Sequence, residues 1–103
     1  MSEIDVVQLE QALLDGAVLV DVREPGEYAQ AHVPGARLIP MGQLGSRLPE
    51  LDRSRPVHLI CASGNRSGAM CRLLTANGFE AVNVDGGTKA WVGSGRPVES
   101  GLS

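Results

Sequence analysis

The residues best placed to do chemistry lie in one short stretch, from Cys61 to Ser67. An apolar run ends at Ile60 and predicts a buried strand that delivers the cysteine at its C-terminal end. Gly64 has the conformational freedom that a tight loop needs, and Arg66 opens a segment that is predicted to be helical. A loop at a helix N-terminus points backbone N–H groups into one concavity, which binds anions and stabilises a thiolate. The stretch therefore predicts a cysteine nucleophile that attacks an anionic substrate.

Both cysteines also have a simpler interpretation. A lone cysteine at a strand end is most often a small apolar core residue. At Cys61, the order of strand, cysteine, glycine-bearing loop, arginine and helix favours a nucleophile instead. Cys71 lies beside Met70 and close to Leu73 in the predicted helix, so we expect it to pack in the core rather than to act as a resolving thiol.

The overall composition limits the classes of partner. The chain has 103 residues, of which 43% are hydrophobic, and a formal net charge of −3. This length is typical of a single domain with one core. Because there is no basic block, we expect no nucleic-acid partner, and the attraction of an anionic substrate must come from local geometry. No run approaches the roughly 18 apolar residues of a membrane span, so we expect no membrane partner either.

The N-terminus and the cysteines suggest a compartment. Residues 1–5 are acidic and lack the basic start and apolar middle of a signal peptide. We therefore expect a cytoplasmic protein, in which Cys61 and Cys71 stay reduced. The two histidines, His32 and His58, do not have the spacing to the cysteines that metal ligands show, so we predict no metal site.

Short apolar strands alternate with helical segments, which predicts an α/β domain with a single parallel sheet and helices on both faces. Strands are expected at 18–20, near 37–39, at 57–60 and at 81–84, and helices at 6–15, 27–31, 41–51, 66–77 and around 90–91. Pro49 should end or distort the third helix. Asp21 and Arg23 follow the first strand, at the edge where open α/β sheets build their sites. The last dozen residues are predicted to form a surface tail with a frayed end.

Four separated motifs resemble those of the rhodanese family, whose members are sulfurtransferase modules. The motifs are Asp21-Val22-Arg23-Glu24 with Glu27-Tyr28, His32-Val33-Pro34-Gly35-Ala36, Cys61-Ala62-Ser63-Gly64-Asn65-Arg66-Ser67, and Gly86-Gly87-Thr88-Lys89-Ala90-Trp91 followed by Gly95-Arg96-Pro97-Val98-Glu99. Each motif is weak alone, but their order and spacing are specific. The resemblance covers about residues 4–99, which implies a single rhodanese-like domain over residues 1–103 with a tail at 100–103.

This resemblance implies a reaction and a set of site residues. Cys61 would attack the sulfane sulfur of thiosulfate or of a persulfide donor and retain it as a persulfide. A thiol or cyanide acceptor would then remove the sulfur in a ping-pong cycle. The anionic donor and the persulfide would be held by the loop residues Ala62, Ser63, Gly64, Asn65, Arg66 and Ser67. No cofactor is implied, because sulfur itself is the group transferred, and we expect a monomer.

The other polar residues of these motifs have less direct interpretations. Asp21 and Arg23 are predicted to support the active loop, and the alternative is an ion pair between them or with Glu27. His32 precedes a turn and is predicted to be a structural hydrogen-bonding residue rather than a general base. Ala31 stands where the family usually has glycine, which should tighten that turn.

Two other functions share parts of this chemistry. Cysteine-dependent phosphatases use the same thiolate and anion site, but they have five residues between cysteine and arginine, whereas this chain has four, 62–65. The shorter loop favours a sulfur atom over a tetrahedral phosphoryl group. A persulfide carrier that hands sulfur to a partner protein shares the first half-reaction and remains an alternative. Our main prediction is a thiosulfate sulfurtransferase of the rhodanese type.

Overall fold

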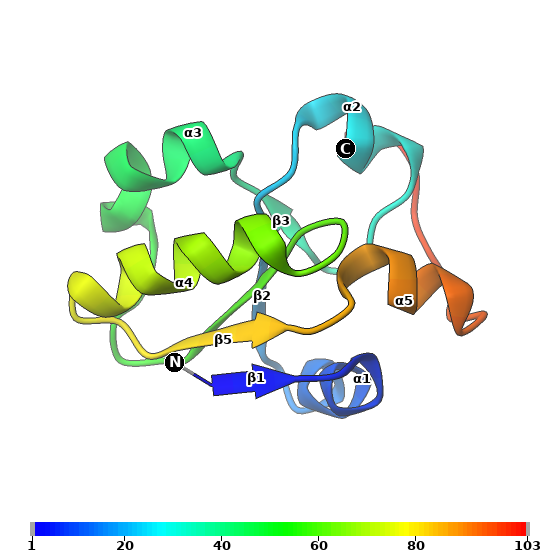
Figure 1. Cartoon of the computed structure of the whole chain (residues 1–103), viewed down its shortest axis with the longest axis horizontal. Helices are drawn as coiled ribbons and strands as arrows, with labels where there is room; N and C mark the ends of the chain where they lie inside the picture. Colours follow the sequence, from blue (N-terminus) through cyan, green and yellow to red (C-terminus); the bar gives the residue numbers. More distant parts are fainter. Residues whose placement is uncertain (1, 103) are drawn as a thin grey trace.

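The computed structural model describes residues 2–102 (Figure 1). Met1 of the acidic N-terminus and Ser103 of the predicted tail lie outside the described residues. In chain order the elements are β1 (Ser2–Ile4), α1 (Val6–Leu14), β2 (Val18–Asp21), α2 (Pro25–Gln30), β3 (Arg37–Leu38), α3 (Met41–Leu44), the 3-10 helix η1 (Gly45–Glu50), β4 (Val57–Ile60), α4 (Asn65–Ala76), β5 (Ala81–Val84) and α5 (Gly87–Gly93).

The strands form one five-stranded sheet in the order β1-β5-β4-β2-β3. Every neighbouring pair of strands is parallel. In the central pair, Asp21 at the end of β2 is in register with Ile60 at the end of β4. Because parallel strands end at the same edge of a sheet, Cys61 emerges beside the residues that follow Asp21. The predicted single parallel sheet is confirmed.

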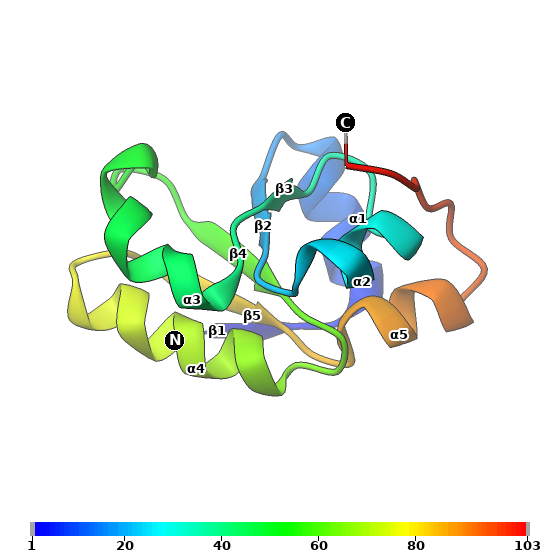
Figure 2. The same cartoon turned by 90° about the horizontal axis from the view of Figure 1, so that it is seen from above.

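Helices cover both faces of this sheet, as predicted (Figures 1 and 2). One core cluster joins the strands to α3, η1 and α4, and it includes Leu44, Leu48 and Leu74. A second cluster, on the other face, joins them to α1 and α5 through Leu9 and Trp91. The residues that can do chemistry therefore lie at one end of a sheet that is supported from both sides.

Three elements differ from the sequence prediction. The edge strand β1 was not predicted, because Ser2–Ile4 is short and has no apolar run of its own; it is a strand because it pairs with β5. The predicted helix at 41–51 is instead a single α-helical turn followed by η1, with Pro49 inside the 3-10 helix. The helix predicted at 27–31 begins earlier, because Pro25 occupies the first turn, where a missing N–H costs nothing.

The C-terminal segment lies on the surface as predicted and is bound to the rest of the domain up to residue 101, whereas the predicted frayed end at Ser103 lies outside the described residues. Glu99 and His32 exchange two backbone hydrogen bonds of 2.9 Å. The Gly101 N–H donates to the Ala29 carbonyl at 2.8 Å, and Trp91 Nε1 donates to the Pro97 carbonyl at 2.8 Å. These bonds bind the segment to α2 and α5 up to residue 101, and Figure 2 shows it running past both helices.

None of the helices within residues 2–102 has the length and apolarity that crossing a membrane requires. The cytoplasmic location and the monomeric state stay predictions.

Candidate active site

The active loop, residues 61–67, joins β4 to α4 through one left-handed turn. Gly64 has φ 105°, a backbone angle that side chains other than glycine resist, and it precedes the first residue of α4. This turn brings the Gly64 N–H back to Cys61, where it donates to Sγ at 3.0 Å. The conformational freedom predicted for Gly64 is thus used to point a backbone donor at the candidate nucleophile.

The Cys61 thiol is buried, with 1% of the residue exposed, and is surrounded by hydrogen-bond donors. Burial alone would raise the pKa of this thiol. Hydrogen bonds from the Ser67 hydroxyl and from the backbone amides of Ser67, Gly64 and Ser63 outweigh burial, so the pKa of Cys61 lies below its ordinary value. The loop therefore favours the thiolate, which is the nucleophilic form of cysteine.

A buried network behind the loop involves Asn83, a residue that the sequence analysis did not single out. The Ser67 hydroxyl lies 3.3 Å from Cys61 Sγ and 2.6 Å from Asn83 Oδ1, so one proton has two acceptors. Asn83 Nδ2 donates to the Gly64 carbonyl at 3.2 Å and to a Glu3 carboxylate oxygen at 3.1 Å. Asn83 of β5 thus holds Gly64 and Ser67 of the active loop, and Glu3 of β1 holds Asn83. A polar residue within the otherwise apolar 81–84 strand was the only sequence signal for Asn83.

Arg66 is held by an ion pair to α2. Its two terminal nitrogens lie 2.7 and 2.9 Å from the two carboxylate oxygens of Glu27. The Arg66 hydrogen bond lowers the pKa of the Glu27 carboxyl to about 2, and the same bond raises the pKa of Arg66. From the sequence, Glu27 was expected only as an alternative partner of Asp21 or Arg23. In the structure, Glu27 instead forms an ion pair with Arg66 of the active loop. This pair neutralises the positive charge of Arg66.

α5 holds the loop from the other side. The Thr88 N–H and hydroxyl donate to the Cys61 carbonyl at 2.9 and 3.1 Å, and the Lys89 N–H donates to the Ala62 carbonyl at 3.0 Å. A Cβ atom at Gly87 would lie 2.5 Å from the Cys61 carbonyl oxygen, so only glycine allows this approach. The motif that follows β5 therefore packs its helix directly on the backbone of the candidate nucleophile.

Asp21 and Arg23 pair with each other, which was the alternative considered for them. Arg23 Nη2 donates to Asp21 Oδ2 at 2.8 Å, and Arg23 also donates to the Ala31 carbonyl at 2.8 Å. Among residues 2–102, no hydrogen bond joins either side chain to the active loop. The pair holds the end of α2, which carries Glu27, and its supporting role for the active loop stays a prediction.

The remaining sequence predictions concern residues away from the loop. His32 has its Nδ1 2.7 Å from the Tyr28 carbonyl oxygen and stacks on the Tyr28 ring, as expected of a structural residue. Ala31 has extended backbone with φ −167°, which any residue adopts, so the expected tightening of that turn is not seen. Cys71 is buried in the apolar core as predicted, and burial raises its pKa to about 11. No group of three potential metal ligands occurs within residues 2–102.

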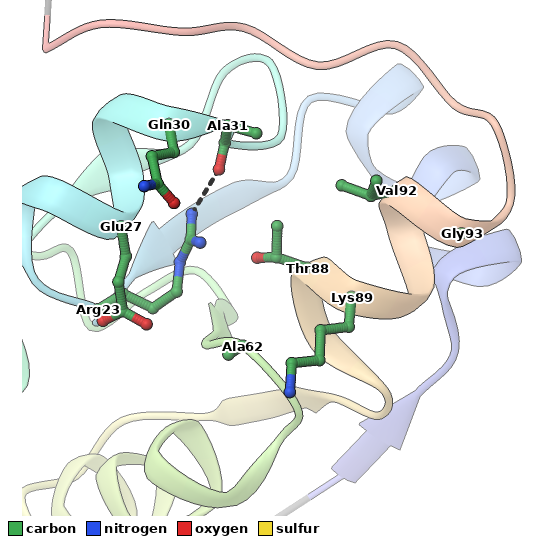
Figure 3. Close-up of a pocket in the computed structure, with 9 residues that line it drawn as sticks. All are labelled: Arg23, Glu27, Gln30, Ala31, Ala62, Thr88, Lys89, Val92 and Gly93. Atoms are coloured by element: carbon green, nitrogen blue, oxygen red, sulfur yellow. Dashed lines mark hydrogen bonds between the residues drawn. The ribbon is translucent and has the colours of Figure 1, made fainter.

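A cavity of about 450 Å³ opens beside the loop, between α2 and α5 (Figure 3). Glu27 and Gln30 line it from α2, Ala62 lines it from the loop, and Lys89 and Val92 line it from α5. Figure 3 shows the Lys89 side chain extending from α5 toward the loop at Ala62. The cavity therefore adjoins the residue that follows the candidate nucleophile.

Comparison with known proteins identifies the family. The family model for the rhodanese-like domain matches residues 5–94. The chain belongs to this family. A rhodanese-related protein from Thermoplasma volcanium has the same fold, with a TM-score of 0.90, 31% sequence identity and full coverage of both chains. The resemblance predicted from the four sequence motifs is thus confirmed by the family match.

Several relatives of this rhodanese-like domain have names that refer to sulfur. A sulfurtransferase of Allochromatium vinosum is 39% identical over 101 residues, which are 95% of this chain and 94% of that protein. The Bacillus subtilis protein YrkF, whose name proposes a sulfur carrier, is 41% identical over 76 residues. That match takes in 73% of this chain but only 41% of YrkF, so YrkF is a considerably longer protein.

Proposed function

We propose that the protein is a sulfurtransferase that carries a sulfane sulfur as a persulfide on Cys61. The observation that carries this proposal is the environment of Cys61 Sγ, a buried sulfur that accepts from Gly64 N–H at 3.0 Å and faces the Ser67 hydroxyl at 3.3 Å. Such donors stabilise negative charge on sulfur, both in the thiolate and in a persulfide anion. No cofactor is needed for this chemistry.

The reaction has two half-reactions that balance. In the first, the Cys61 thiolate attacks the outer sulfur of thiosulfate, the bond between the two sulfur atoms of thiosulfate breaks, and sulfite leaves with the electron pair. In the second, an acceptor thiolate or cyanide attacks the outer sulfur of the persulfide, and the Cys61 thiolate leaves. The product is the persulfide of the acceptor thiol, or thiocyanate. Each half-reaction thus regenerates the state that the other consumes, which gives ping-pong kinetics.

Arg66 supports the donor half-reaction in this proposal. Its guanidinium, paired with Glu27, lies half-buried at the start of α4 and fixes the loop in place. The ion pair uses one bond from each terminal nitrogen, so other N–H groups of the guanidinium remain free to donate to the oxygens of an anionic donor. We propose a binding role for Asn65 and for the amides of residues 62–67 on the same grounds, namely their position around Sγ.

Steady-state kinetics test the proposal. Thiosulfate and cyanide are varied together, and thiocyanate is measured. Parallel double-reciprocal lines are expected for the wild-type protein, and no turnover is expected for Cys61→Ser. Intersecting lines would mean that both substrates bind before any product leaves, which contradicts a persulfide intermediate. If thiosulfate gives no product, a small organic persulfide is used as donor with the same readout, and failure of both donors would overturn the proposal.

A persulfide carrier is the second candidate, because the relative YrkF has a name that proposes a sulfur carrier. A carrier performs the first half-reaction but passes its sulfur to a partner protein. After loading and removal of the donor, a carrier would keep its sulfur for hours in millimolar cyanide, whereas the proposed enzyme would lose it within a turnover. A phosphatase function has less support. The Gly64 N–H donates to Cys61 Sγ at 3.0 Å, so the loop is narrow and suits one sulfur atom better than a phosphoryl group.

A further inference from the structure

The residues that line the cavity between α2 and α5 would suit a specific class of sulfur acceptor. Its walls include the small or aliphatic residues Ala31, Ala62 and Val92, and it holds about 450 Å³. Thiosulfate has only five heavy atoms and needs far less space than this. A role for this cavity in binding the acceptor rests on the proposed function, because the acceptor is the molecule that takes sulfur from Cys61.

The charged residues of the cavity wall leave one positive charge uncompensated. Arg23 is paired with Asp21 and hydrogen-bonded to the Ala31 carbonyl. Glu27 is paired with Arg66. Within residues 2–102, the ammonium group of Lys89 has no ion-pair or hydrogen-bond partner. Lys89 is also the only lysine of the 103-residue sequence, so a reagent that modifies amines can react only with Lys89 and the N-terminal amine.

We propose that this cavity binds the acceptor and selects small thiols that carry a carboxylate, with Lys89 as the specificity-determining residue. The aliphatic walls accommodate the carbon chain of such a thiol, and the ammonium of Lys89 attracts its carboxylate. This local charge is needed because the protein as a whole has a net charge of −3, which repels anions at a distance.

The position of the cavity fits the acceptor half-reaction. Its Ala62 wall directly follows Cys61, and Lys89 is fixed to that wall by its own N–H bond to the Ala62 carbonyl at 3.0 Å. A persulfide places the transferable sulfur one bond beyond Sγ. The acceptor thiolate attacks this outer sulfur, the bond between the two sulfur atoms breaks, the electron pair returns to Cys61 Sγ, and the acceptor leaves as its own persulfide.

The first test uses protein loaded with sulfur and freed of donor, and three acceptors of similar size. These are 3-mercaptopropionate, 2-mercaptoethanol and 2-aminoethanethiol, which carry a carboxylate, no charge and an ammonium group. Loss of the persulfide is followed by intact mass, and each rate is expressed per thiolate. The carboxylate thiol is expected to react fastest with the wild-type protein, and Lys89→Gln is expected to slow it about three- to fivefold while leaving 2-mercaptoethanol unchanged.

Lys89→Glu should reverse the order, so that 2-aminoethanethiol becomes the fastest acceptor. Arg72→Gln is the matched control, because it removes one positive charge from an exposed position on α4 that does not line the cavity. An effect of Arg72→Gln equal to that of Lys89→Gln would mean that only net charge matters and would overturn the proposal. Equal slowing of all three acceptors by Lys89→Gln would also overturn it.

A second test does not depend on sulfur transfer. Iodoacetate and iodoacetamide alkylate Cys61 with the same displacement chemistry but differ in charge, and their rate ratio is normalised to that of free cysteine. The ratio should favour iodoacetate in the wild-type protein and fall about threefold in Lys89→Gln. An unchanged ratio would overturn the role of Lys89 even if sulfur transfer is established, and a changed ratio would support it even if thiosulfate proves not to be the donor.

Discussion

The two cysteines of this protein share a core and differ in chemistry. Cys61 and Cys71 belong to the same apolar cluster, and their residues are 1% and 0% exposed. Hydrogen bonds nevertheless bring the pKa of Cys61 below the ordinary thiol value, whereas burial raises the pKa of Cys71 to about 11. Burial is therefore common to both, and what separates them is the supply of hydrogen-bond donors.

The number of hydrogen-bond donors that reach each thiol follows from the position of the cysteine relative to α4. The first amides of a helix have no intrahelical partner, so the loop before α4 can direct them at Cys61. Cys71 lies in the middle of α4, where the amides are used by the helix itself. A cysteine before a helix is thus activated by the same backbone that leaves a cysteine within the helix inert.

The largest effect is expected from removing each thiol in turn. Cys61→Ser should reduce thiocyanate formation from thiosulfate and cyanide by at least about a thousandfold, because no other group forms the persulfide. Cys71→Ala should keep activity within about twofold and lower the free energy of unfolding by about 1 kcal/mol, measured in urea. Comparable loss of activity in both variants, with both folded by circular dichroism, would mean that the two thiols act together.

Removal of Arg66 should affect the reactivity of Cys61 and leave Cys71 unchanged. Arg66→Ala is expected to lower kcat/KM for thiosulfate about tenfold or more, because the charge near the donor and the bond to Glu27 are both lost. Arg47→Ala is a matched control, since this partly buried arginine likewise pairs with a glutamate, Glu50, and makes no hydrogen bond to the loop among the described residues. Unchanged donor kinetics in Arg66→Ala would show that the guanidinium serves neither the donor nor the loop.

Ser67→Ala should reduce the difference between the two thiols. It deletes a donor to Sγ that favours the thiolate, so the pKa of Cys61 should rise toward its ordinary value. The rate of alkylation by iodoacetamide against pH measures this. Because a lowered pKa keeps the thiolate populated at lower pH, the wild-type rate should fall at lower pH than the variant rate. A profile of Ser67→Ala that coincides with the wild-type profile would assign the shift to the backbone amides alone.

The smallest effect is expected on stability. Asn83→Ala removes the anchor that joins the Ser67 hydroxyl and the Gly64 carbonyl to β5, and it should lower the free energy of unfolding by about 1–3 kcal/mol. Asn77→Ala, which removes a single exposed hydrogen bond to the Leu73 carbonyl, is the control and should cost less. Equal costs in urea unfolding would mean that the buried network contributes nothing beyond a surface bond.

The local parts of the fold could be predicted from the sequence. The strands at 57–60 and 81–84 and the helix that begins at Val6 are coded by neighbouring residues. β1 could not be predicted, because a three-residue strand gains its stability from pairing with β5 about 80 residues later. The 3-10 helix at 45–50 was only partly predicted, because Gly45 and Pro49 weaken an α-helix without determining what replaces it.

In the candidate site, too, local features could be predicted and long-range contacts could not. The order of Cys61, Gly64 and Arg66 was sufficient to predict the loop, because these residues act on one another at short range. The partners from other elements were not predicted: Glu27 lies 39 residues from Arg66, and Asn83 lies 16 residues from Ser67. Glu27 has no local sequence signal for a partner in the loop, and the only signal at Asn83 is that it is polar within an otherwise apolar strand, because tertiary packing brings both residues to the loop.

The most direct measurement is the intact mass of the protein after thiosulfate, with the modified residue located by peptide mapping. The account predicts a gain of about 32 Da, one sulfur atom, on Cys61 and none on Cys71, reversed by a thiol reductant and absent from Cys61→Ser. Sulfur found on Cys71, or a gain that persists in Cys61→Ser, would contradict the claim that hydrogen-bond donors select the reactive thiol.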